Sequence, residues 1–520
     1  MGHDSGGAVE GCLRVSAIRP IPERLPVGGG TAIFLDGLCS HPDGPLEDLR
    51  VSVDGLDHRV LAAGMPPPEG FKGSDYWWAI VPFEAVSRPR LAQLRLRART
   101  ARGEEALGEL GTVELHPSVD VGDPAPPSRS RAAGATGGVR KRPLVAICMA
   151  TYDPPLDLFR RQIESIRAQT YENWVCVISD DRSSTAVLAE MRAVLADDER
   201  FSLTTGSRRL GFYGNFERAL ALAPREAELL AMCDQDDRWY PEKLEVLESS
   251  MEPGAKLVYS DMRIVDRTGR VRFDTYWTYR RNSHTNFGSL LLANTITGAA
   301  SLFAREVLEY ALPFPPHYGI GYHDHWVALV AMALGNVGYV DRPLYDYVQH
   351  GGQIVGHAGQ LPGHARANGL LRRAPRGTEA ASDGRGPRGR LARLATHGLA
   401  RETRRLYFTH YCGTVIATKV TELRCGSVMA PAKRRTLRRF ARPERTIPWL
   451  ALRALRPWTG RTETLQREQA LLGGLAWRHC AELRRRLRRR ATRRRATARA
   501  AASASRGPGR LPCPPHRRGL

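Results

Sequence analysis

The chain has 520 residues, of which 42% are hydrophobic, so it is long enough for two or three domains with buried cores. The formal net charge is +23, but fourteen arginines and no acidic residue fall between Arg484 and the C-terminus, so the charge does not by itself predict a nucleic-acid-binding fold. Nine cysteines without Cys-x-x-Cys spacing argue against a disulfide framework or a zinc site and favour a reducing compartment.

The N-terminus lacks a basic start followed by an apolar segment, which predicts no secretory signal. No uninterrupted apolar run reaches the roughly 18–20 residues that a membrane-spanning helix requires. We therefore expect a cytoplasmic protein, with peripheral contact to the inner face of the cell membrane.

Residues 1–120 alternate apolar and polar over short stretches, such as 31–35, 49–53 and 76–81, with turn residues between them. This pattern predicts a small, Ig-like antiparallel β-sandwich. The region has no cluster of titratable residues that would suit catalysis, so we interpret it as an accessory domain. Residues 121–141 are rich in Pro, Gly and Ala and are predicted to form a linker.

From residue 142 to 358 the pattern changes to alternating strands and helices. Apolar runs at 144–149 and 229–233 are typical of buried parallel strands, and 156–166 has the spacing of an amphipathic helix. This rhythm predicts an α/β fold with a doubly wound, mostly parallel sheet, in which ligands bind outside the carboxyl ends of the strands.

Three predicted strand ends carry acidic residues, at 152–153, 180–181 and 234–237. Carboxylates that converge at one edge of a sheet repel each other and need a counter-charge. Divalent cations prefer oxygen ligands, and magnesium sites typically use one or two carboxylates plus substrate phosphates. An isolated Asp-x-Asp is more often an acidic turn that caps a helix, but acidic ends on three strands favour a binding site.

The rest of the chain is arginine-rich. Residues 359–398 are predicted to be a Gly/Arg-rich loop, 399–483 a basic helical region, and 484–520 a disordered Arg-rich tail. The tail lacks interleaved aromatic residues that would stack on bases, which disfavours nucleic acid as a partner. An anionic membrane surface suits it better.

The motifs together resemble the inverting family 2 glycosyltransferases of the GT-A fold, most closely the bacterial enzymes that build surface polysaccharides, including rhamnosyltransferases. The resemblance spans residues 143–357 and is carried by four stretches in order, 150–153, 178–183, 234–237 and 323–326. It implies transfer of a sugar from a nucleotide-diphosphate donor to a hydroxyl of a glycan or lipid-linked acceptor. The reaction would be a single displacement with inversion.

The resemblance also implies a role for each matched residue. The predicted nucleotide-sugar-binding residues are Thr151, Tyr152, Asp153, Asp181 and Asp234. Asp153 stands where the family usually has Asn, so we assign it to the binding loop and not to the chemistry.

A divalent metal, magnesium or manganese, is implied near the third acidic strand end. Asp236 would ligate it, Asp234 would lie near the ribose or the metal, and His350 would approach the metal and the diphosphate. Asp324 falls where the family places its general base, a role that typically contributes about 10²–10⁴-fold to the rate. The preceding residue, His323, departs from the usual Glu-Asp pattern.

Other interpretations stay open from the residues alone. Asp324 and His323 could simply cap a helix, and His350 could be a structural histidine. A metal-dependent nucleotidyltransferase also needs paired carboxylates, although it usually has a Gly-rich basic phosphate loop, which residues 150–154 are not. A nucleic-acid-binding protein is a third interpretation, suggested only by the tail.

Overall fold

A computed structural model describes residues 13–65, 76–100, 102–118, 142–196, 198–278, 280–318, 322–350, 398–456 and 460–504. The predicted linker at 121–141 and all but the last residue of the predicted loop at 359–398 lie outside these ranges. Across the ranges that are described, no helix is long and apolar enough to cross a membrane.

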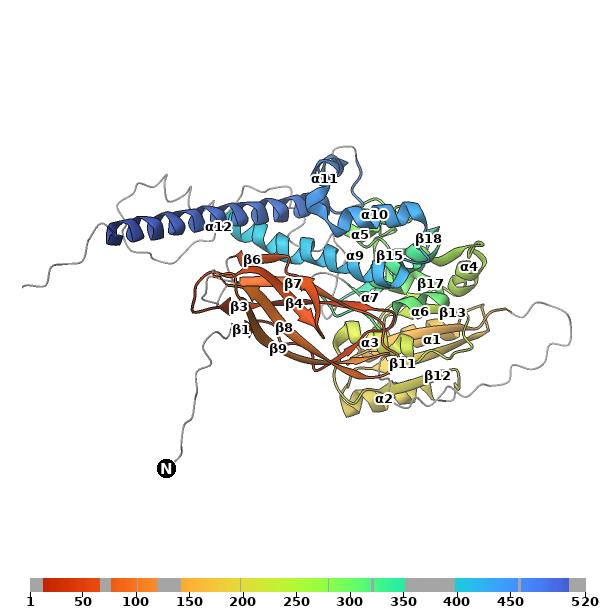
Figure 1. The fold of residues 1–520 in the computed structure, drawn as a ribbon. Coiled ribbons are helices and arrows are strands. Elements are labelled where there is room, and N and C mark those ends of the chain that lie inside the picture. Colours follow the sequence, from red (N-terminus) through yellow and green to blue (C-terminus); the bar gives the residue numbers. More distant parts are fainter. Residues whose placement is uncertain are drawn as a thin grey trace, which may run out of the picture.

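The described residues of the N-terminal region form strands and no helix (Figure 1, red to orange). They are β1 (Arg14–Ala17), β2 (Arg24–Pro26), β3 (Thr31–Ser40), β4 (Glu47–Val53), β5 (Leu56–Arg59), β6 (Ala62–Met65), β7 (Tyr76–Phe83), β8 (Arg90–Arg99) and β9 (Glu105–His116). Two sheets result, in the orders β1-β3-β7-β6 and β2-β9-β8-β4-β5, and apart from the parallel pair β2–β9 all neighbours are antiparallel.

The sheet that contains β7 is covered on both faces. Trp77 and Trp78 are adjacent, yet both are fully buried. Because side chains alternate along a strand, Trp77 packs into the core between the two sheets, whereas Trp78 faces the C-terminal helices and stacks edge-on against Tyr407, with ring centroids 5.7 Å apart. The sandwich is therefore packed onto the rest of the molecule.

A third, larger sheet has nine strands in the part of the chain that the structure describes. They are β10 (Val145–Thr151), β11 (Trp174–Asp180), β12 (Phe201–Thr205), β13 (Leu229–Cys233), β14 (Arg238–Trp239), β15 (Ala255–Asp266), β16 (Val271–Phe273), β17 (Ser301–Ala304) and β18 (Asn336–Gln349). The order is β12-β11-β10-β13-β17-β15-β18-β14, with β16 on β15.

The predicted α/β class is confirmed, and the first four strands of this order are parallel as expected. Beyond β13 the sheet is mixed, since β17 runs antiparallel to both of its neighbours while β18 is parallel to β15. β10 lies in the middle of the parallel half, and Val145 to Met149 are fully buried, which explains their uninterrupted apolar run.

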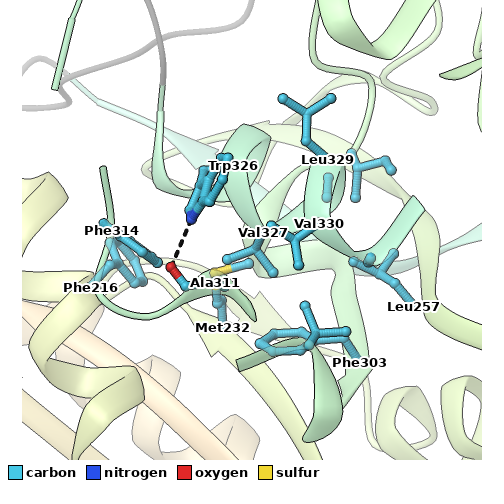
Figure 2. Close-up of a cluster of buried hydrophobic side chains, with 14 of the residues drawn as sticks. Phe216, Met232, Leu257, Phe303, Ala311, Phe314, Trp326, Val327, Leu329 and Val330 are labelled. Atoms are coloured by element: carbon cyan, nitrogen blue, oxygen red, sulfur yellow. Dashed lines mark hydrogen bonds between the residues drawn. The ribbon is translucent and has the colours of Figure 1, made fainter. Parts of the chain in front are cut away.

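Helices cover the larger sheet. They are α1 (Leu156–Arg167), α2 (Thr185–Leu195), α3 (Gly211–Ala221), α4 (Lys243–Ser249), α5 (Phe287–Leu292), α6 (Glu306–Ala311) and α7 (His323–Leu334). Figure 2 shows α7 inserted among apolar side chains, with Val330 near Phe303 and Leu257 of the sheet. Trp326 Nε1 donates a hydrogen bond to Ala311 O at 2.9 Å, which fixes α7 against the end of α6.

The C-terminal region is helical. Its main helices are α9 (Cys412–Cys425), α10 (Pro431–Ala441), α11 (Ile447–Ala454) and α12 (Arg467–Ala504). The predicted disordered tail began at Arg484, whereas α12 continues to Ala504 and extends away from the body of the molecule (Figure 1). The difference has a simple reason: between these residues the sequence is rich in Arg and Ala, both good helix formers, and contains neither Gly nor Pro.

Candidate functional site

A pocket of about 400 Å³ lies at the carboxyl ends of β10, β11 and β13, the edge where doubly wound sheets bind ligands. The structure brings together six of the predicted site residues in its lining: Thr151, Tyr152, Asp181, Asp234, Asp236 and Asp324. The other two, Asp153 and His350, lie beside the pocket and contact its loops.

One end of the pocket combines an exposed aromatic ring with a cation. Tyr152 is 38% exposed, and its backbone N–H donates to Gln235 Oε1 at 2.8 Å. The guanidinium carbon of Arg209 lies 3.8 Å from the centroid of the Tyr152 ring, and Arg209 Nε lies 4.0 Å from Asp181 Oδ2. A flat ring beside a cation offers a surface for a nucleobase and its phosphates.

Asp181 lines the pocket and also holds the start of α3. Its carboxylate is almost fully buried, and its two oxygens accept hydrogen bonds from the N–H groups of Leu210 at 2.7 Å and Gly211 at 2.8 Å. A carboxylate at a helix N-terminus satisfies otherwise unpaired amides and is favoured by the helix dipole. Asp181 therefore fixes the wall of the pocket through α3.

Asp153 is turned away from the pocket. It follows β10 with a φ of +35°, and its carboxylate accepts a hydrogen bond from Ser184 N at 2.8 Å. Its own N–H donates to Ser183 Oγ at 2.8 Å. These bonds join the loop after β10 to the loop after β11, so the side chain shapes the binding loop from behind.

The acidic segment after β13 carries two buried carboxylates besides Asp234. Asp236 Oδ2 lies 2.7 Å from His350 Nε2, which reaches the segment from the end of β18. Asp237 is fully buried, and its Oδ1 accepts a hydrogen bond from Val348 N at 3.1 Å. Its Oδ2 has no hydrogen-bond partner among the residues that the structure describes. Such an arrangement of negative charge is costly without a cation nearby.

The pKa values report this cost. Burial, and then the charges of Asp236 and Asp324, raise the pKa of Asp234 to about 7. Burial also raises the pKa of Asp236, partly offset by His350. The buried ammonium of Lys243 lies 3.4 Å from the centre of the Trp239 ring, and burial lowers its pKa to about 7, so it compensates for only part of the negative charge.

The residues present suit a divalent cation whose coordination is completed by a substrate. Asp236 and Asp234 supply the carboxylate oxygens that magnesium and manganese prefer, and His350 adds an imidazole nitrogen beside Asp236. Within the part of the chain that the structure describes, no three His, Cys, Asp or Glu residues are grouped closely enough to hold a metal alone. The missing ligands would have to come from phosphates and water.

Asp324 lies in the first turn of α7, on the same pocket. Its Oδ1 accepts a hydrogen bond from His325 N at 2.7 Å and its Oδ2 one from Gly298 N at 3.4 Å. Burial raises its pKa to about 6, against the opposing effect of these hydrogen bonds. A carboxylate with a pKa near neutrality can accept a proton in catalysis. The residue before α7, Tyr322, makes no side-chain capping bond.

His323 has a packing role. Its ring stacks on Phe216 of α3 with centroids 3.8 Å apart and an interplanar angle of 9°. Burial lowers the pKa of His323 to about 3, so it stays neutral. The stacking joins α7 to α3 and thereby sets the position of Asp324 relative to the end of the pocket that contains Tyr152 and Arg209.

Two lining residues that the sequence analysis missed are Arg280 and Arg467. Arg467 begins α12, far along the chain from the motifs, and Arg280 lies in a loop without a motif. In a chain with 77 Lys and Arg residues, no local signal distinguishes these two from solvent-exposed arginines.

Comparison with known proteins assigns most of the region around this pocket to a protein family. Residues 146–311 match the family described as Glycosyl transferase family 2. The chain contains a family 2 glycosyltransferase domain. The predicted family and enzyme class are thereby confirmed, and the domain includes every strand end that supplies a predicted nucleotide- or metal-binding aspartate.

Curated relatives match this glycosyltransferase domain in part. An uncharacterized glycosyltransferase, MJ1057 from Methanocaldococcus jannaschii, is 28% identical over 137 residues, which are 26% of this chain and 47% of the relative. WfgD from Escherichia coli, a UDP-Glc:α-D-GlcNAc-diphosphoundecaprenol β-1,3-glucosyltransferase, is 30% identical over 129 residues, 25% of this chain and 49% of the relative. The chain thus spans less than half of the length of each.

Two solved structures are similar over more of the chain. TarS 1–349 from S. aureus in complex with UDP-GlcNAc has 12% identity and a TM-score of 0.34, over 58% of this chain and 92% of TarS. The mannosyltransferase PcManGT from Pyrobaculum calidifontis, in complex with GDP-Man and Mn²⁺, has 18% identity and a TM-score of 0.32, over 64% and 88%.

Proposed function

We propose that the pocket transfers a sugar from a nucleotide-diphosphate donor to a hydroxyl of an acceptor, by a single displacement that inverts the anomeric carbon. The observation that carries this proposal is the convergence of Asp181, Asp234, Asp236 and Asp324 on one pocket of a family 2 glycosyltransferase domain. The relatives support a role in surface polysaccharide biosynthesis, since one is named for a diphosphoundecaprenol-linked acceptor and another as a putative colanic acid biosynthesis glycosyl transferase.

The donor would bind along the wall formed by the ends of β10, β11 and β13. Tyr152 and Arg209 offer the nucleobase a ring and a cation, and Asp181 keeps α3 in place beside them. Asp234 and Asp236, with His350, would hold the divalent cation. Such a cation supplies stabilisation of the negative charge that develops on the leaving diphosphate.

Asp324 would act as the general base. The acceptor hydroxyl must lose a proton as it attacks the anomeric carbon, and the Asp324 carboxylate would accept it. The backbone amides of His325 and Gly298 hold this carboxylate in place. One base acting on the attacking hydroxyl, without a protein nucleophile, gives inversion.

The test is nucleoside diphosphate release from a panel of nucleotide sugars with manganese or magnesium. We expect release with the correct donor, and a loss of at least about 100-fold in Asp236→Asn, because removing an electrostatic stabiliser of the transition state typically costs about that much. Asp157→Asn is the matched control, since Asp157 is exposed on α1 and pairs with Arg267 outside the pocket.

Undiminished release by Asp236→Asn would contradict the metal assignment. Release of inorganic pyrophosphate in place of a nucleoside diphosphate would instead favour the nucleotidyltransferase interpretation.

A further inference from the structure

Two guanidinium groups line the pocket beside Asp324. Arg280 Nη2 donates a hydrogen bond to Asn294 O at 2.5 Å, and Arg467 Nη1 donates one to Leu292 O at 3.1 Å. Both arginines are thus held by the same short segment, which runs from the end of α5 at Leu292 to Asn294. The side chain of Asn294 also hydrogen-bonds Asp324, so this segment places both cations at the general-base end of the pocket, apart from Tyr152 and Arg209.

Neither guanidinium is neutralised within the described part of the chain. Arg280 is 8% exposed, and its Nε is buried without a hydrogen-bond partner. The acidic group that influences it is Glu463, which is already ion-paired with Arg456. Burial lowers the pKa of Arg467 to about 10, and the charge of Arg280 lowers it further. Two neighbouring cations, Arg280 buried and Arg467 partly buried, have free donor capacity and form a site that favours an anion.

Arg467 also lies at the border of a second, apolar pocket of about 80 Å³. The two pockets share Tyr322, His325 and Arg467. Apolar side chains from α5, α7 and α9 line the second pocket, among them Leu291, Trp326, Leu329, Ile416 and Val420. A ligand that occupies both pockets must therefore carry an anionic group next to a hydrocarbon chain.

We propose that Arg280 and Arg467 bind the diphosphate of a lipid-linked acceptor whose first hydrocarbon carbons enter the apolar pocket. This inference rests on the proposed function, because it places the acceptor sugar attached to that diphosphate at Asp324. The bidentate geometry of a guanidinium matches phosphate oxygens, and the apolar pocket distinguishes a lipid diphosphate from a free one.

The experiment measures binding by isothermal titration calorimetry without nucleotide, donor sugar or divalent cation. Geranyl diphosphate is the probe, and inorganic diphosphate and geraniol are the comparison ligands. We expect geranyl diphosphate to bind the full chain more tightly than either, and Arg280→Gln and Arg467→Gln to weaken it at least tenfold. Arg484→Gln is the matched control, because Arg484 is an exposed arginine on the same helix, α12.

A second variant tests the apolar pocket. Gly413 of α9 lines this pocket, and a Cβ added there would meet no atom closer than 3.9 Å, so Gly413→Leu adds apolar volume at the pocket wall without a clash of its Cβ. We expect it to weaken geranyl diphosphate and to leave inorganic diphosphate unchanged. Arg467→Lys should recover part of the affinity lost in Arg467→Gln, since it restores the charge without the bidentate fork.

Unchanged geranyl diphosphate affinity in folded Arg280→Gln and Arg467→Gln would overturn the proposal. Equal affinity for inorganic and geranyl diphosphate, insensitive to Gly413→Leu, would overturn the lipid assignment. The unfolding temperature of each variant reports whether its fold is intact. Its binding of a nucleoside diphosphate with manganese reports whether the proposed donor site is intact. The calorimetric assay needs neither donor nor turnover, so it tests the acceptor site independently of glycosyl transfer. Failure of the proposed function would be seen only in the assay of nucleoside diphosphate release.

Discussion

The ionised state of Asp324 that the proposed general base requires is the state that lowers the stability of the fold. Burial raises its pKa to about 6, above the ordinary value of 3.8, so the folded protein binds this proton more tightly than the unfolded chain does. Its contribution to stability is therefore greatest at low pH and is lost as the pH rises from about 4 to about 6. At neutral pH the folded protein carries a buried negative charge that catalysis would require.

Replacement of Asp324 by Asn should separate the two effects. We expect sugar transfer to fall by about 10²–10⁴-fold, because the general base is lost, while nucleotide binding is retained. The free energy of unfolding should rise by about 1–3 kcal/mol at pH 8, since a shift of this size in pKa corresponds to about that cost. Urea unfolding at pH 8 and at pH 4, without metal or nucleotide, measures the difference.

At pH 4 the variant and the original chain should have similar stability, because the carboxyl group is then largely protonated in the folded protein. Unchanged turnover in Asp324→Asn would remove this residue from the mechanism, whatever the unfolding data show.

At the scale of elements, helix α3 holds the two strand ends that carry the proposed nucleotide-binding loops. Asn215 is 2% exposed, and its Nδ2 donates to Thr151 O at 3.0 Å and to Ser179 O at 2.9 Å. Its Oδ1 accepts a hydrogen bond from Ser179 Oγ at 2.7 Å and one from Arg218 Nη2 at 3.0 Å. One side chain on α3 therefore joins the ends of β10 and β11.

Asn215→Ala should lower the free energy of unfolding by about 2–4 kcal/mol, because buried carbonyls of both strands lose their donor. Nucleotide binding should weaken as well, since the loops after β10 and β11 lose their common support. Urea denaturation and calorimetry with a nucleoside diphosphate measure the two effects. Asn173→Ala is the control, as Asn173 makes one exposed hydrogen bond, to Arg142 O. Equal stability of the two variants would show that Asn215 does not support these strands.

The elements of the parallel half of the sheet could be predicted because their signals are local. The apolar run from Val145 and the one from Leu229 are buried strands. The first leads into Thr151 and Tyr152 and the second into Asp234, all of which line the pocket. The mixed half could not be predicted, because the direction of β17 depends on which strands it pairs with and not on its own four residues. The length of α12 was missed because arginine runs were interpreted through charge and not through helix propensity.

At the scale of the whole molecule, Arg424 of α9 joins three parts of the chain. It is 4% exposed, its Nε donates to Gly30 O of the sandwich at 2.6 Å, and its Nη1 donates to Tyr310 O at 3.1 Å and Ala311 O at 2.8 Å. Ala311 O also accepts the hydrogen bond from Trp326 Nε1 that Figure 2 shows. The C-terminal region thus holds the sandwich against the helices beneath the pocket.

Arg424→Ala should lower the free energy of unfolding by about 2–4 kcal/mol, because several buried carbonyls lose a charged donor. We also expect faster cleavage between the sandwich and the rest of the chain in limited proteolysis, since a shared anchor is removed. Arg438→Ala is the control, as Arg438 is an exposed arginine of α10. Identical proteolysis of the two variants would mean that the sandwich is held by its apolar contacts alone.

In the candidate site as well, some residues could be predicted from local sequence motifs, and others are placed only by tertiary packing. Asp234, Asp236 and Asp324 could be found because each belongs to a short motif at the end or start of an element. Arg280 and Arg467 could not, because they meet in the pocket only when segments nearly 190 residues apart in the sequence pack against the C-terminal end of α5 and Asn294. Such contacts depend on tertiary packing, which no local pattern encodes.

Helix α12 begins at the pocket with Arg467, and three turns later Arg478 Nη2 donates to Leu61 O of the sandwich at 3.0 Å. The same helix therefore contributes to the wall of the pocket and contacts the sandwich. A displacement of the sandwich that shifts Arg478 would therefore also move the Arg467 guanidinium in the pocket, because one continuous helix carries both side chains.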